Sequence, residues 1–364
     1  MKVAIIHYWL INCRGGEKVL EALCELYPQA DIYTHVYDES AFKNSIISKH
    51  KVTTTFISKL PKAIKAYQSY LPLMPLALEE LDLNGYDLVI SSESGPAKGV
   101  IPPPGVPHIC YCHSPMRYAW DMYNEYKNRA GWLKRKLMPP LLHYLRRWDQ
   151  QNSTQVSHFV ANSSFVAKRI NSYYRRKASV IYPPVSFDEF NISETQGDYY
   201  LLLGQLVSYK RADIAVKAFN KSGKKLIVVG EGEQFNELKE IAKPNVQLLG
   251  RQPFNEIKRL LSDCQALVFP GVEDFGIVPL EAMASGRPVI AYKKGGALET
   301  VAEGISGMFF NEQSEQSLQA AINEFENNKH NFKPEVIRAY VKKFDQTRFK
   351  QEFKILVDEV LSEY

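Results

Sequence analysis

The sequence lacks the long apolar segments that would place the protein in a membrane. No stretch approaches the roughly 20 apolar residues that a spanning helix requires, and no secretory signal precedes the first apolar run, residues 3–6. We therefore expect a cytoplasmic protein. The formal net charge is only +5, which does not demand a nucleic-acid partner and instead favours anionic ligands or an anionic membrane surface.

Cysteine is also scarce, and its positions do not form a disulfide framework. The five cysteines are Cys13, Cys24, Cys110, Cys112 and Cys264. Cys110 and Cys112 stand beside His113, but this group lacks the second ligand pair that a zinc site needs. We expect buried cysteines on a strand, no metal site and no bound cofactor.

What the sequence does contain is an alternation of strand-like and helix-like segments over its whole length. The expected strands are 3–6, 87–91, 108–112, 158–161, 179–182, 199–204, 225–230, 246–249, 266–270 and 289–292. The expected helices include 17–27, 212–220, 234–242 and 255–262. Many of the strands are nearly continuous apolar runs, as in parallel strands buried on both faces. Repeated βαβ units predict an α/β protein with parallel sheets flanked by helices.

The length and the position of two prolines predict two domains. A chain of 364 residues is long enough for two cores, and Pro183-Pro184 follows a strand and suits a boundary. We expect domains at 1–183 and 184–345, and a helix at 346–364 whose apolar stripe packs back on the N-terminal domain. Because ligands bind beyond the carboxyl ends of parallel strands, the pattern predicts two Rossmann-like domains facing a central cleft.

The most informative stretch is 273–288. Its Pro279 suits the first turn of a helix and Gly286 suits its end. No capping side chain stands just before Pro279, so the first amides of this helix form an anion site that a diphosphate can satisfy. We expect Glu273 in the preceding loop and Glu281 in the first turn, as acceptors for sugar and ribose hydroxyls. Local sequence leaves a plain alternative open, in which Glu281 complements the helix dipole and Glu273 is solvated.

The sequence of this stretch resembles that of a known family. Glu273 and Glu281 form the E-x7-E motif of retaining glycosyltransferases, with Phe-Gly-Ile-Val between them and Glu-Ala-Met-Ala-x-Gly-x-Pro-Val from the second Glu onward. The chain resembles glycosyltransferase family 4, of GT-B fold. Segments 111–121, 181–185 and 210–213 resemble bacterial O-antigen and capsule mannosyltransferases within that family. The resemblance covers about residues 1–345.

The resemblance implies a role for each end of the motif and for each half of the chain. It implies that 1–183 binds the acceptor and 184–345 binds the nucleotide sugar. Glu273 then binds hydroxyls of the donor sugar, and Glu281 binds the ribose. The backbone amides that serve the sugar and the diphosphate belong to Phe275, Gly276 and Ile277.

The segment 203–211 resembles the family's phosphate-binding loop, with one departure. The family usually has Arg where this chain has Gln205, and a Gln donates hydrogen bonds but carries no charge. Lys210 is kept and is expected to neutralise the leaving diphosphate, although a solvated lysine at a helix start is the alternative. Arg211 or Lys168 can compensate for the missing cation.

Two further donor contacts come from the resemblance. The stretch 246–251, ending in Arg251, is expected to read the base. Gly15 and Gly16 follow the first strand and open a helix, and the family places this pair against the donor phosphate because a bare backbone can approach closely. The GxGxxG dinucleotide motif is absent, and a simple tight turn is the alternative for the glycine pair.

The resemblance also places His113 beneath the donor sugar, where it contacts a hydroxyl and helps to stabilise positive charge at the anomeric carbon. A packed histidine without a catalytic role is the alternative. In this fold the leaving diphosphate accepts the proton of the acceptor, so no carboxylate nucleophile is required, and helix amides with Lys210 stand in for a metal. The expected catalytic residues are His113, Glu273 and Lys210.

Residues 127–147 are both basic and apolar. They contain seven Lys or Arg and no acid, with large apolar side chains interleaved. Such an amphipathic stretch suits an anionic membrane surface or a lipid-diphosphate acceptor. A surface helix that buries its apolar side on the domain is an equally open interpretation.

Together these observations predict a metal-independent retaining hexosyltransferase. We expect it to move mannose from GDP-mannose to a glycan or polyprenyl-diphosphate-linked acceptor in lipopolysaccharide O-antigen or capsule synthesis, at the inner face of the plasma membrane. A UDP-sugar transferase of the same fold is the first alternative. A weakly active scaffold subunit, supported only by Gln205, and a sugar-phosphate epimerase are the others.

Overall fold

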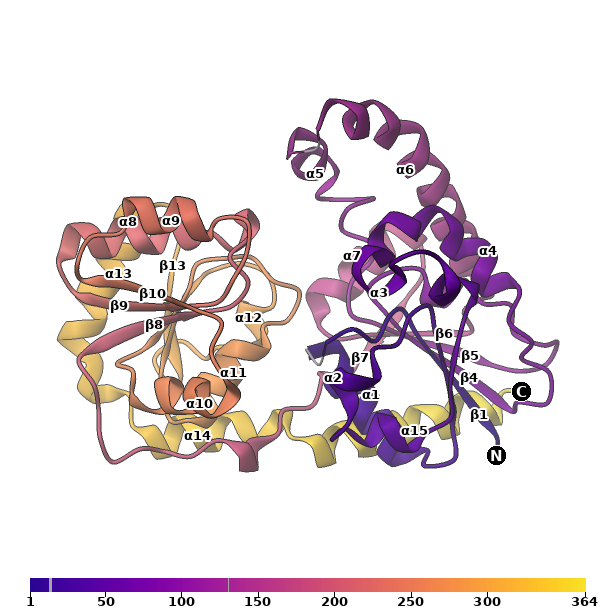
Figure 1. Cartoon of the computed structure of the whole chain (residues 1–364). Helices are drawn as coiled ribbons and strands as arrows, with labels where there is room; N and C mark the ends of the chain where they lie inside the picture. The colour runs from indigo at the N-terminus through magenta and orange to yellow at the C-terminus, as the bar shows by residue number, and fades with distance from the viewer. Residues whose placement is uncertain (13–14, 130) are drawn as a thin grey trace. The chain divides into compact units, whose positions relative to one another are not determined.

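The computed structural model describes residues 1–12, 15–129 and 131–364, so Cys13 lies outside the described residues. The chain divides into two compact units. Unit 1 comprises Met1–Pro184 and Gln346–Tyr364, and unit 2 comprises Val185–Asp345. Each unit is a parallel sheet with helices on both faces (Figure 1). No helix in the described ranges is long and apolar enough to cross a membrane.

Unit 1 contains a seven-stranded sheet in which every neighbouring pair is parallel. In order across the sheet, the strands are β3 (Val52–Thr54), β2 (Asp31–Thr34), β1 (Val3–His7), β4 (Leu88–Glu93), β5 (His108–Cys112), β6 (His158–Ala161) and β7 (Ala178–Val180). The winding direction reverses between β1 and β4. The carboxyl ends of these two strands therefore form the switch point at which open α/β sheets bind ligands.

The helices of unit 1 cover both faces of this sheet. They are α1 (Gly15–Leu26), α2 (Glu39–Phe42), α3 (Ala63–Ala66), α4 (Met74–Glu79), α5 (Tyr123–Arg129), α6 (Trp132–Asn152), α7 (Ser164–Tyr174) and α15 (Gln346–Ser362). Because side chains alternate along a strand, Ile5 packs with α1 on one face, whereas Ala4 and Ile6 pack with α4 and α6 on the other.

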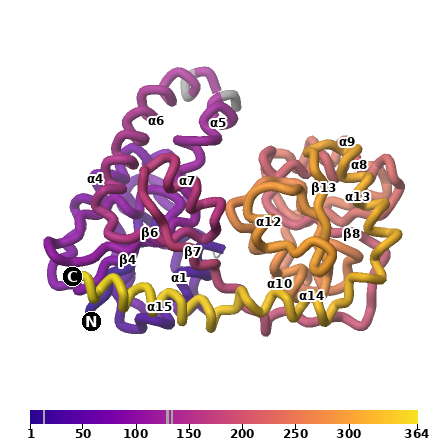
Figure 2. The backbone as a smooth tube through the Cα atoms, turned by 180° about the vertical axis from the view of Figure 1, so that it is seen from behind, coloured from indigo at the N-terminus to yellow at the C-terminus, as the bar shows by residue number. Residues whose placement is uncertain are grey.

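The last helix, α15, belongs to the core of unit 1. Phe349 and Phe353 are fully buried, and their rings lie 5.7 and 6.4 Å from the ring of Tyr111 on β5. Figure 2 shows α15 running along unit 1 beside α1. The apolar stripe of the final segment is therefore buried in the first half of the fold, although the whole of unit 2 intervenes in sequence.

Unit 2 contains a six-stranded parallel sheet. In order, the strands are β10 (Val246–Gly250), β9 (Lys225–Val229), β8 (Tyr199–Leu203), β11 (Leu267–Phe269), β12 (Val289–Tyr292) and β13 (Gly307–Phe310). The helices are α8 (Ala212–Ser222), α9 (Phe235–Ile241), α10 (Phe254–Asp263), α11 (Ile277–Ala284), α12 (Ala297–Thr300), α13 (Glu315–Asn328) and α14 (Pro334–Val341). The switch point of this sheet lies between β8 and β11.

The expected α/β class with parallel sheets is confirmed, and every expected strand is present with small shifts at its ends. Three strands were not anticipated, namely β2, β3 and β13. The cysteines of β5, Cys110 and Cys112, are fully buried and unpaired. Within the described residues no group of His, Cys, Asp and Glu is arranged to hold a metal ion.

Candidate active site

The switch point of unit 2 brings a lysine and a glutamate together. Lys210 ends the short 3-10 helix η7 (Ser208–Lys210) after β8, and Glu273 lies in the loop after β11. Lys210 Nζ is 2.7 Å from Glu273 Oε1, with the two side chains 20% and 23% exposed. Two segments that sequence analysis treated separately therefore meet at the edge where ligands of such sheets bind. The pair offers a cation for a phosphate and a carboxylate for a hydroxyl.

Close backbone approach puts Lys210 in this position. A Cβ added to Gly271 would lie 2.8 Å from Lys210 Cα, and one added to Gly204 would lie 3.3 Å from Lys210 Nζ. A side chain at Gly271 would collide with the backbone of the lysine, so only glycine lets the two loops touch. Sequence analysis did not single out Gly271, although a Pro-Gly pair after a buried strand is a signal for such a turn.

Helix α11 begins beside this pair with an open N-terminus. Its N-cap is Gly276, at φ 91°, which has no side chain to accept from the first amides. Pro279 falls in the first turn, but Glu281 does not, and that expectation was wrong. The helix starts at Ile277, two residues before the proline, so Glu281 lies in the second turn.

A second glycine pair supports the loop that carries Glu273. The amide of Gly296 donates to the carbonyl of Glu273 at 2.9 Å. A Cβ on Gly296 would lie 2.3 Å from Phe275 Cα, and one on Gly295 would lie 2.6 Å from Glu273 O. Gly295 and Gly296 therefore fix the path of residues 273–275. Neither glycine was anticipated, although a Gly-Gly pair two residues after a strand is a signal for a turn.

The remaining expected donor contacts take different positions in unit 2. Gln205 is exposed just beyond the carboxyl end of β8. Arg211 makes a bidentate contact with Asp213, with N–O distances of 3.0 and 3.1 Å. Arg251 is exposed directly after the edge strand β10. The structure thus brings Lys210 and Glu273 into contact, whereas the guanidinium of Arg211 is engaged by its own helix.

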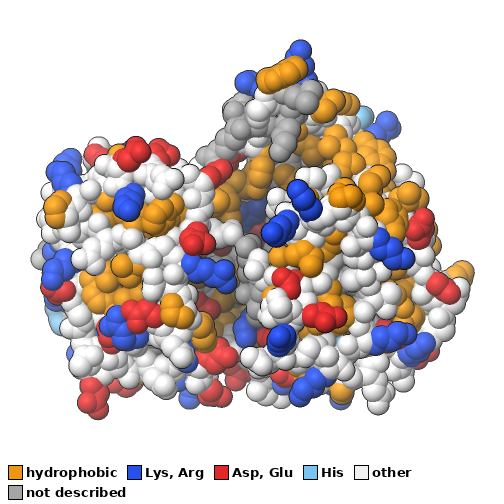
Figure 3. All heavy atoms as spheres, in the orientation of Figure 1, with side chains coloured by type: hydrophobic (Ala, Val, Ile, Leu, Met, Phe, Trp, Pro, Cys, Tyr) orange, Lys and Arg blue, Asp and Glu red, His pale blue; other side chains and the backbone are white. Residues whose placement is uncertain are grey.

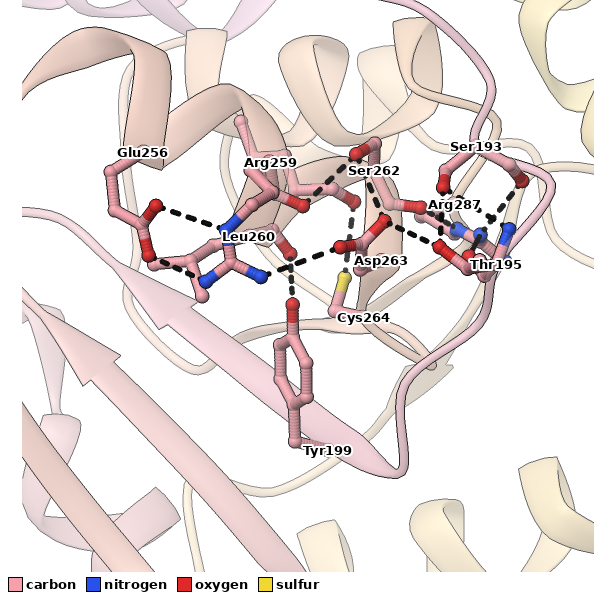
Figure 4. A network of polar contacts seen from close by, with 11 residues as sticks. Ser193, Thr195, Tyr199, Glu256, Arg259, Leu260, Ser262, Asp263, Cys264 and Arg287 are labelled. Carbon is pink, nitrogen blue, oxygen red and sulfur yellow. Dashed lines mark hydrogen bonds and ion pairs between the residues drawn. The ribbon is translucent and has the colours of Figure 1, made fainter.

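Arg287, which follows the E-x7-E segment, is a structural residue. Its guanidinium is buried and donates to the carbonyls of Ser262, Ser193 and Thr195 (Figure 4). Hydrogen bonds to three backbone carbonyls hold this guanidinium in place. This side chain therefore ties the C-terminal end of α10 and the chain around residues 193–195 to the segment that follows α11.

The switch point of unit 1 holds His113. It follows β5 directly, and its amide donates to the carbonyl of Glu93 at 2.7 Å, while Asn162 Nδ2 donates to its carbonyl at 2.9 Å. Gly15 and Gly16 are the first residues of α1, and a Cβ on Gly16 would lie 3.6 Å from His113 Nε2. The structure therefore brings the glycine pair and the histidine into one site. Burial, and then the nearby His7, lower the pKa of His113 to about 3, so its ring is neutral near pH 7.

Models of known protein families match both halves of the chain. The family model described as Glycosyltransferase Family 4 matches residues 14–189, and the model described as Glycosyl transferases group 1 matches residues 186–344. The chain belongs to glycosyltransferase family 4. It is accordingly a glycosyltransferase, and the E-x7-E motif and the glycine pair both lie within the matched residues.

Individual relatives of this family 4 glycosyltransferase are distant. An uncharacterized glycosyltransferase of Methanocaldococcus jannaschii is 27% identical over 319 residues, which cover 82% of this chain and 81% of that protein. The O-antigen chain mannosyltransferase RfbU of Salmonella typhimurium is 31% identical over 180 residues, or 47% of this chain and 50% of RfbU. The crystal structure of HepE of Anabaena with UDP-glucose has a TM-score of 0.75 at 20% identity, covering 99% of this chain and 100% of that one. This likeness shows the GT-B fold.

Unit 1 of this family 4 glycosyltransferase contains a fully buried ion network that was not predicted from the sequence. Lys98 pairs with Asp149 of α6 and lies 3.3 Å from Glu93, and none of the three is exposed. Asp149 also accepts from Trp120 Nε1 at 2.8 Å and from the Tyr174 hydroxyl at 2.9 Å. Burial is the main cause that raises the pKa of Glu93 to about 7, against the lowering effect of Lys98. Sequence analysis missed the network because lysines are rarely buried.

The basic stretch 127–147 forms parts of α5 and α6. Ala130 and the side chains of Asn128, Arg129, Leu133 and Lys134 lie outside the described part. The later half of α6 buries Leu142 and Leu145 against unit 1, whereas the earlier half exposes Trp132 (73%) and Leu137 (58%). Figure 3 shows hydrophobic side chains gathered on the face of unit 1 over α4 and α6. The later half of α6 therefore fits the interpretation of a helix that buries its apolar side on the domain, and membrane contact of the earlier half stays a prediction.

Proposed function

We propose that the protein is a retaining, metal-independent transferase that moves mannose from GDP-mannose to a lipid-linked or glycan acceptor of a bacterial surface polysaccharide. The observation that carries the donor site is the Lys210–Glu273 pair beside the open N-terminus of α11. A diphosphate at this helix end accepts from its first amides and from Lys210. Glu273 then exchanges Lys210 for hydroxyls of the sugar.

Mannose is proposed on the likeness to RfbU, which is an O-antigen chain mannosyltransferase and shares 31% identity with this chain over half its own length. A UDP-sugar donor is the second candidate, because HepE of Anabaena has the same fold and was crystallised with UDP-glucose. Gln205 is compatible with either donor, since it lies in the segment 203–211 that resembles the phosphate-binding loop and not in the stretch 246–251 that is expected to read the base.

In the proposed reaction, groups of this chain stabilise the charges that develop on the substrate. Lys210 and the amides of Phe275, Gly276 and Ile277 stabilise the negative charge that develops on the leaving diphosphate. The diphosphate oxygen takes the proton of the acceptor hydroxyl as the new glycosidic bond forms on the same face of the sugar. His113 stabilises the positive charge at the anomeric carbon, and Gly15 and Gly16 leave room for the donor phosphate.

A donor screen tests this proposal. We expect release of GDP from GDP-mannose by the full-length protein, with turnover unchanged by EDTA. Glu273→Ala should lower kcat, because a hydroxyl contact that tightens in the transition state is lost, whereas Glu281→Ala should mainly raise KM, because ribose binding is uniform. Activity with a UDP-sugar but not with GDP-mannose would show that the donor is the UDP-sugar. Wild-type kinetics in both variants would show that the donor binds elsewhere.

We also propose that the early half of α6 contacts an anionic membrane surface. Exposed Trp132 and Leu137 stand beside exposed Arg135 and Lys136, which is the composition of an interfacial helix. Each basic residue near such a surface contributes about 1 kcal/mol. The double variant Arg135→Glu and Lys136→Glu should therefore sediment at least about tenfold less with anionic vesicles.

The matched control for the membrane experiment carries the same charge change on unit 2. Lys239→Glu with Lys243→Glu reverses two exposed lysines. This control should sediment with the vesicles as the wild type does. An equal loss of sedimentation in both double variants would show that only the net charge of the protein matters. No sedimentation of the wild type would show that α6 is an ordinary surface helix.

A further inference from the structure

Four side chains form a continuous polar chain at the switch point of unit 1. His113 Nε2 lies 2.9 Å from Ser92 Oγ, and Ser92 Oγ lies 3.2 Å from His7 Nδ1. His7 Nε2 in turn lies 3.7 Å from Glu17 Oε1. His7 ends β1, Ser92 is its cross-strand partner on β4, and Glu17 is the third residue of α1. His7 and Ser92 are fully buried, and Glu17 is buried too.

With both imidazole rings neutral, the proton count along this chain permits two arrangements. The Ser92 hydroxyl has one proton, and it faces a ring nitrogen on either side. If Ser92 donates to His7 Nδ1, it accepts from a proton on His113 Nε2. If it donates to His113 Nε2 instead, it accepts from a proton on His7 Nδ1, and the proton of the His113 ring moves to Nδ1.

Glu17 selects between the two arrangements. In the first, His7 carries its proton on Nε2 and turns it toward the Glu17 carboxylate. In the second, a bare Nε2 lone pair faces that carboxylate in a buried site, which is unfavourable because like partial charges are poorly screened there. Among the described residues, His7 Nε2 has no hydrogen-bond partner that would offset this repulsion. The carboxylate therefore favours the first arrangement.

We propose that Glu17, His7 and Ser92 form a positioning relay that fixes the tautomer of His113, with the proton on Nε2 and Nδ1 left as an acceptor for a hydroxyl of the donor sugar. The substrate part of this inference rests on the proposed function. The relay is coupled to the glycine pair Gly15–Gly16, because Glu17 directly follows Gly16, whose added Cβ would lie 3.6 Å from His113 Nε2. The first turn of α1 thus carries both the glycine pair and the glutamate that fixes the tautomer of His113.

The electrostatics of the site agree with a neutral acceptor. Burial keeps the pKa of His113 near 3, so the ring does not become a cation beside the positive charge of the reacting sugar. A neutral ring with a bare Nδ1 instead presents a lone pair, which accepts a hydroxyl proton and stabilises nearby positive charge. In a serine-protease triad, loss of the correct histidine tautomer costs up to ~10⁴-fold in kcat.

Nitrogen NMR on the full-length chain, labelled with ¹⁵N at histidine, tests the relay without any substrate. The protein has 8 histidines, and the His113 signals are assigned by their loss in His113→Gln. We expect the wild type to show a proton on Nε2. Ser92→Ala removes the link to His7, and Glu17→Gln supplies an amide that can donate to His7 Nε2, so both should populate the Nδ1-protonated form.

Ser91→Ala is the matched control. Ser91 precedes Ser92 on β4, points to the opposite face of the sheet, and places its Oγ 2.8 Å from Nε2 of the buried His108. This variant loses the same hydroxyl and the same kind of Ser–His contact. It should leave the tautomer of His113 unchanged. A wild type protonated on Nδ1, or an unchanged tautomer in both Ser92→Ala and Glu17→Gln, overturns the relay.

Kinetics then test its role in the reaction. Ser92→Ala and Glu17→Gln should lower kcat at least about tenfold and change the donor KM by less than about threefold, while Ser91→Ala should keep the wild-type kcat. A shifted tautomer with kcat equal to that of the control would overturn the role and leave the proposed function intact. If the wild type transfers no sugar from any donor, the proposed function fails and the NMR result alone decides the relay.

Discussion

Lys98 in unit 1 and Lys210 in unit 2 make similar contacts in different surroundings. Each lysine pairs with a glutamate at the carboxyl edge of a parallel sheet, Lys98 with Glu93 at the end of β4 and Lys210 with Glu273 after β11. Lys98 has no exposed surface and also pairs with Asp149. Lys210 and its partner each keep about a fifth of the side chain exposed.

The contrast separates a structural ion pair from one that can exchange partners. Removing one member of a buried pair leaves an uncompensated charge and costs about 3–5 kcal/mol. A partly exposed pair contributes at most about 1 kcal/mol, because water solvates each partner when the other leaves. The Lys210–Glu273 pair can therefore open for a ligand at little cost, whereas the Lys98 network holds η4 (Ala97–Gly99) to α6.

The largest effect should follow from breaking the buried network. Lys98→Met should lower the free energy of unfolding by about 3–5 kcal/mol, because Glu93 and Asp149 are left buried without a cation. Urea denaturation followed by circular dichroism measures it. The control, Lys225→Met, removes an exposed lysine paired with Asp198 and should change stability by less than about 1 kcal/mol. Similar losses in both variants would show that the buried network is no more important for stability than an exposed pair.

The opposite pattern is expected at the exchangeable pair. Lys210→Ala should reduce turnover roughly 100-fold, as loss of one charge-stabilising group at a transition state does, but should change the free energy of unfolding by less than about 1 kcal/mol. Lys293→Ala is the control, because Lys293 forms an exposed pair with Glu303 in the same unit. A stability loss in Lys210→Ala as large as in Lys98→Met would make Lys210 structural.

A pH series sharpens the comparison on the buried side. The pKa of Glu93 is raised to about 7, above its ordinary value of 4.5, so the native state holds this proton more tightly than the unfolded chain. The stabilisation from this group is therefore complete below about pH 4.5 and is lost as the pH rises toward 7. Glu93→Gln should remove this component, which we expect to exceed about 1 kcal/mol.

The measurement is the difference between wild type and Glu93→Gln in urea denaturation at pH 5 and pH 8. The difference is needed because His35, His108 and His113, whose pKa values are lowered to about 3 by desolvation, contribute a slope of the opposite sign. In those residues the neutral ring favours folding as the pH rises. Parallel pH profiles for the two proteins would show that Glu93 is ionised throughout.

The smallest effect is expected from adding a second cation near the partly exposed Lys210–Glu273 pair. Gln205→Arg restores the residue that the family usually has beside Lys210, and the new guanidinium can donate to the leaving diphosphate. We expect kcat to stay at the wild-type value or to rise by up to about tenfold. Steady-state kinetics with GDP-mannose and with a UDP-sugar checks this. A large fall in kcat with unchanged folding would assign Gln205 a role that a cation disrupts.

The same contrast explains what could be predicted from the sequence. Long apolar strands such as β1 and β5 were found because strands buried on both faces are nearly continuous apolar runs. The short strands β2 and β3, which lie toward one edge, carry polar residues such as Asp31 and Thr53 and were missed. The family motif located residues 273–288, but the exact start of α11, and with it the turn that contains Glu281, depended on backbone geometry at Gly276.

Contacts between distant segments account for most of what was missed. Nothing in the local sequence links Lys98 to Asp149, or Ser92 to His113, because each pair meets only when separate strands and helices assemble. Lys98 and Glu93 are fully buried, although lysine and glutamate are usually exposed, so their residue types gave no sign of the buried network. Gly271, Gly295 and Gly296 became informative only when the backbone atoms they approach were visible.

Helix α15 has a consequence for how the chain folds during synthesis. Residues 346–364 complete the core of unit 1, yet they follow the whole of unit 2 in the chain. A ribosome adding about 5–20 residues per second therefore needs on the order of 10 seconds to make unit 2 while the face of unit 1 that receives Phe349 and Phe353 stays uncovered. Unit 2 can complete its sheet first, and the nascent first half must avoid aggregation until its last helix arrives.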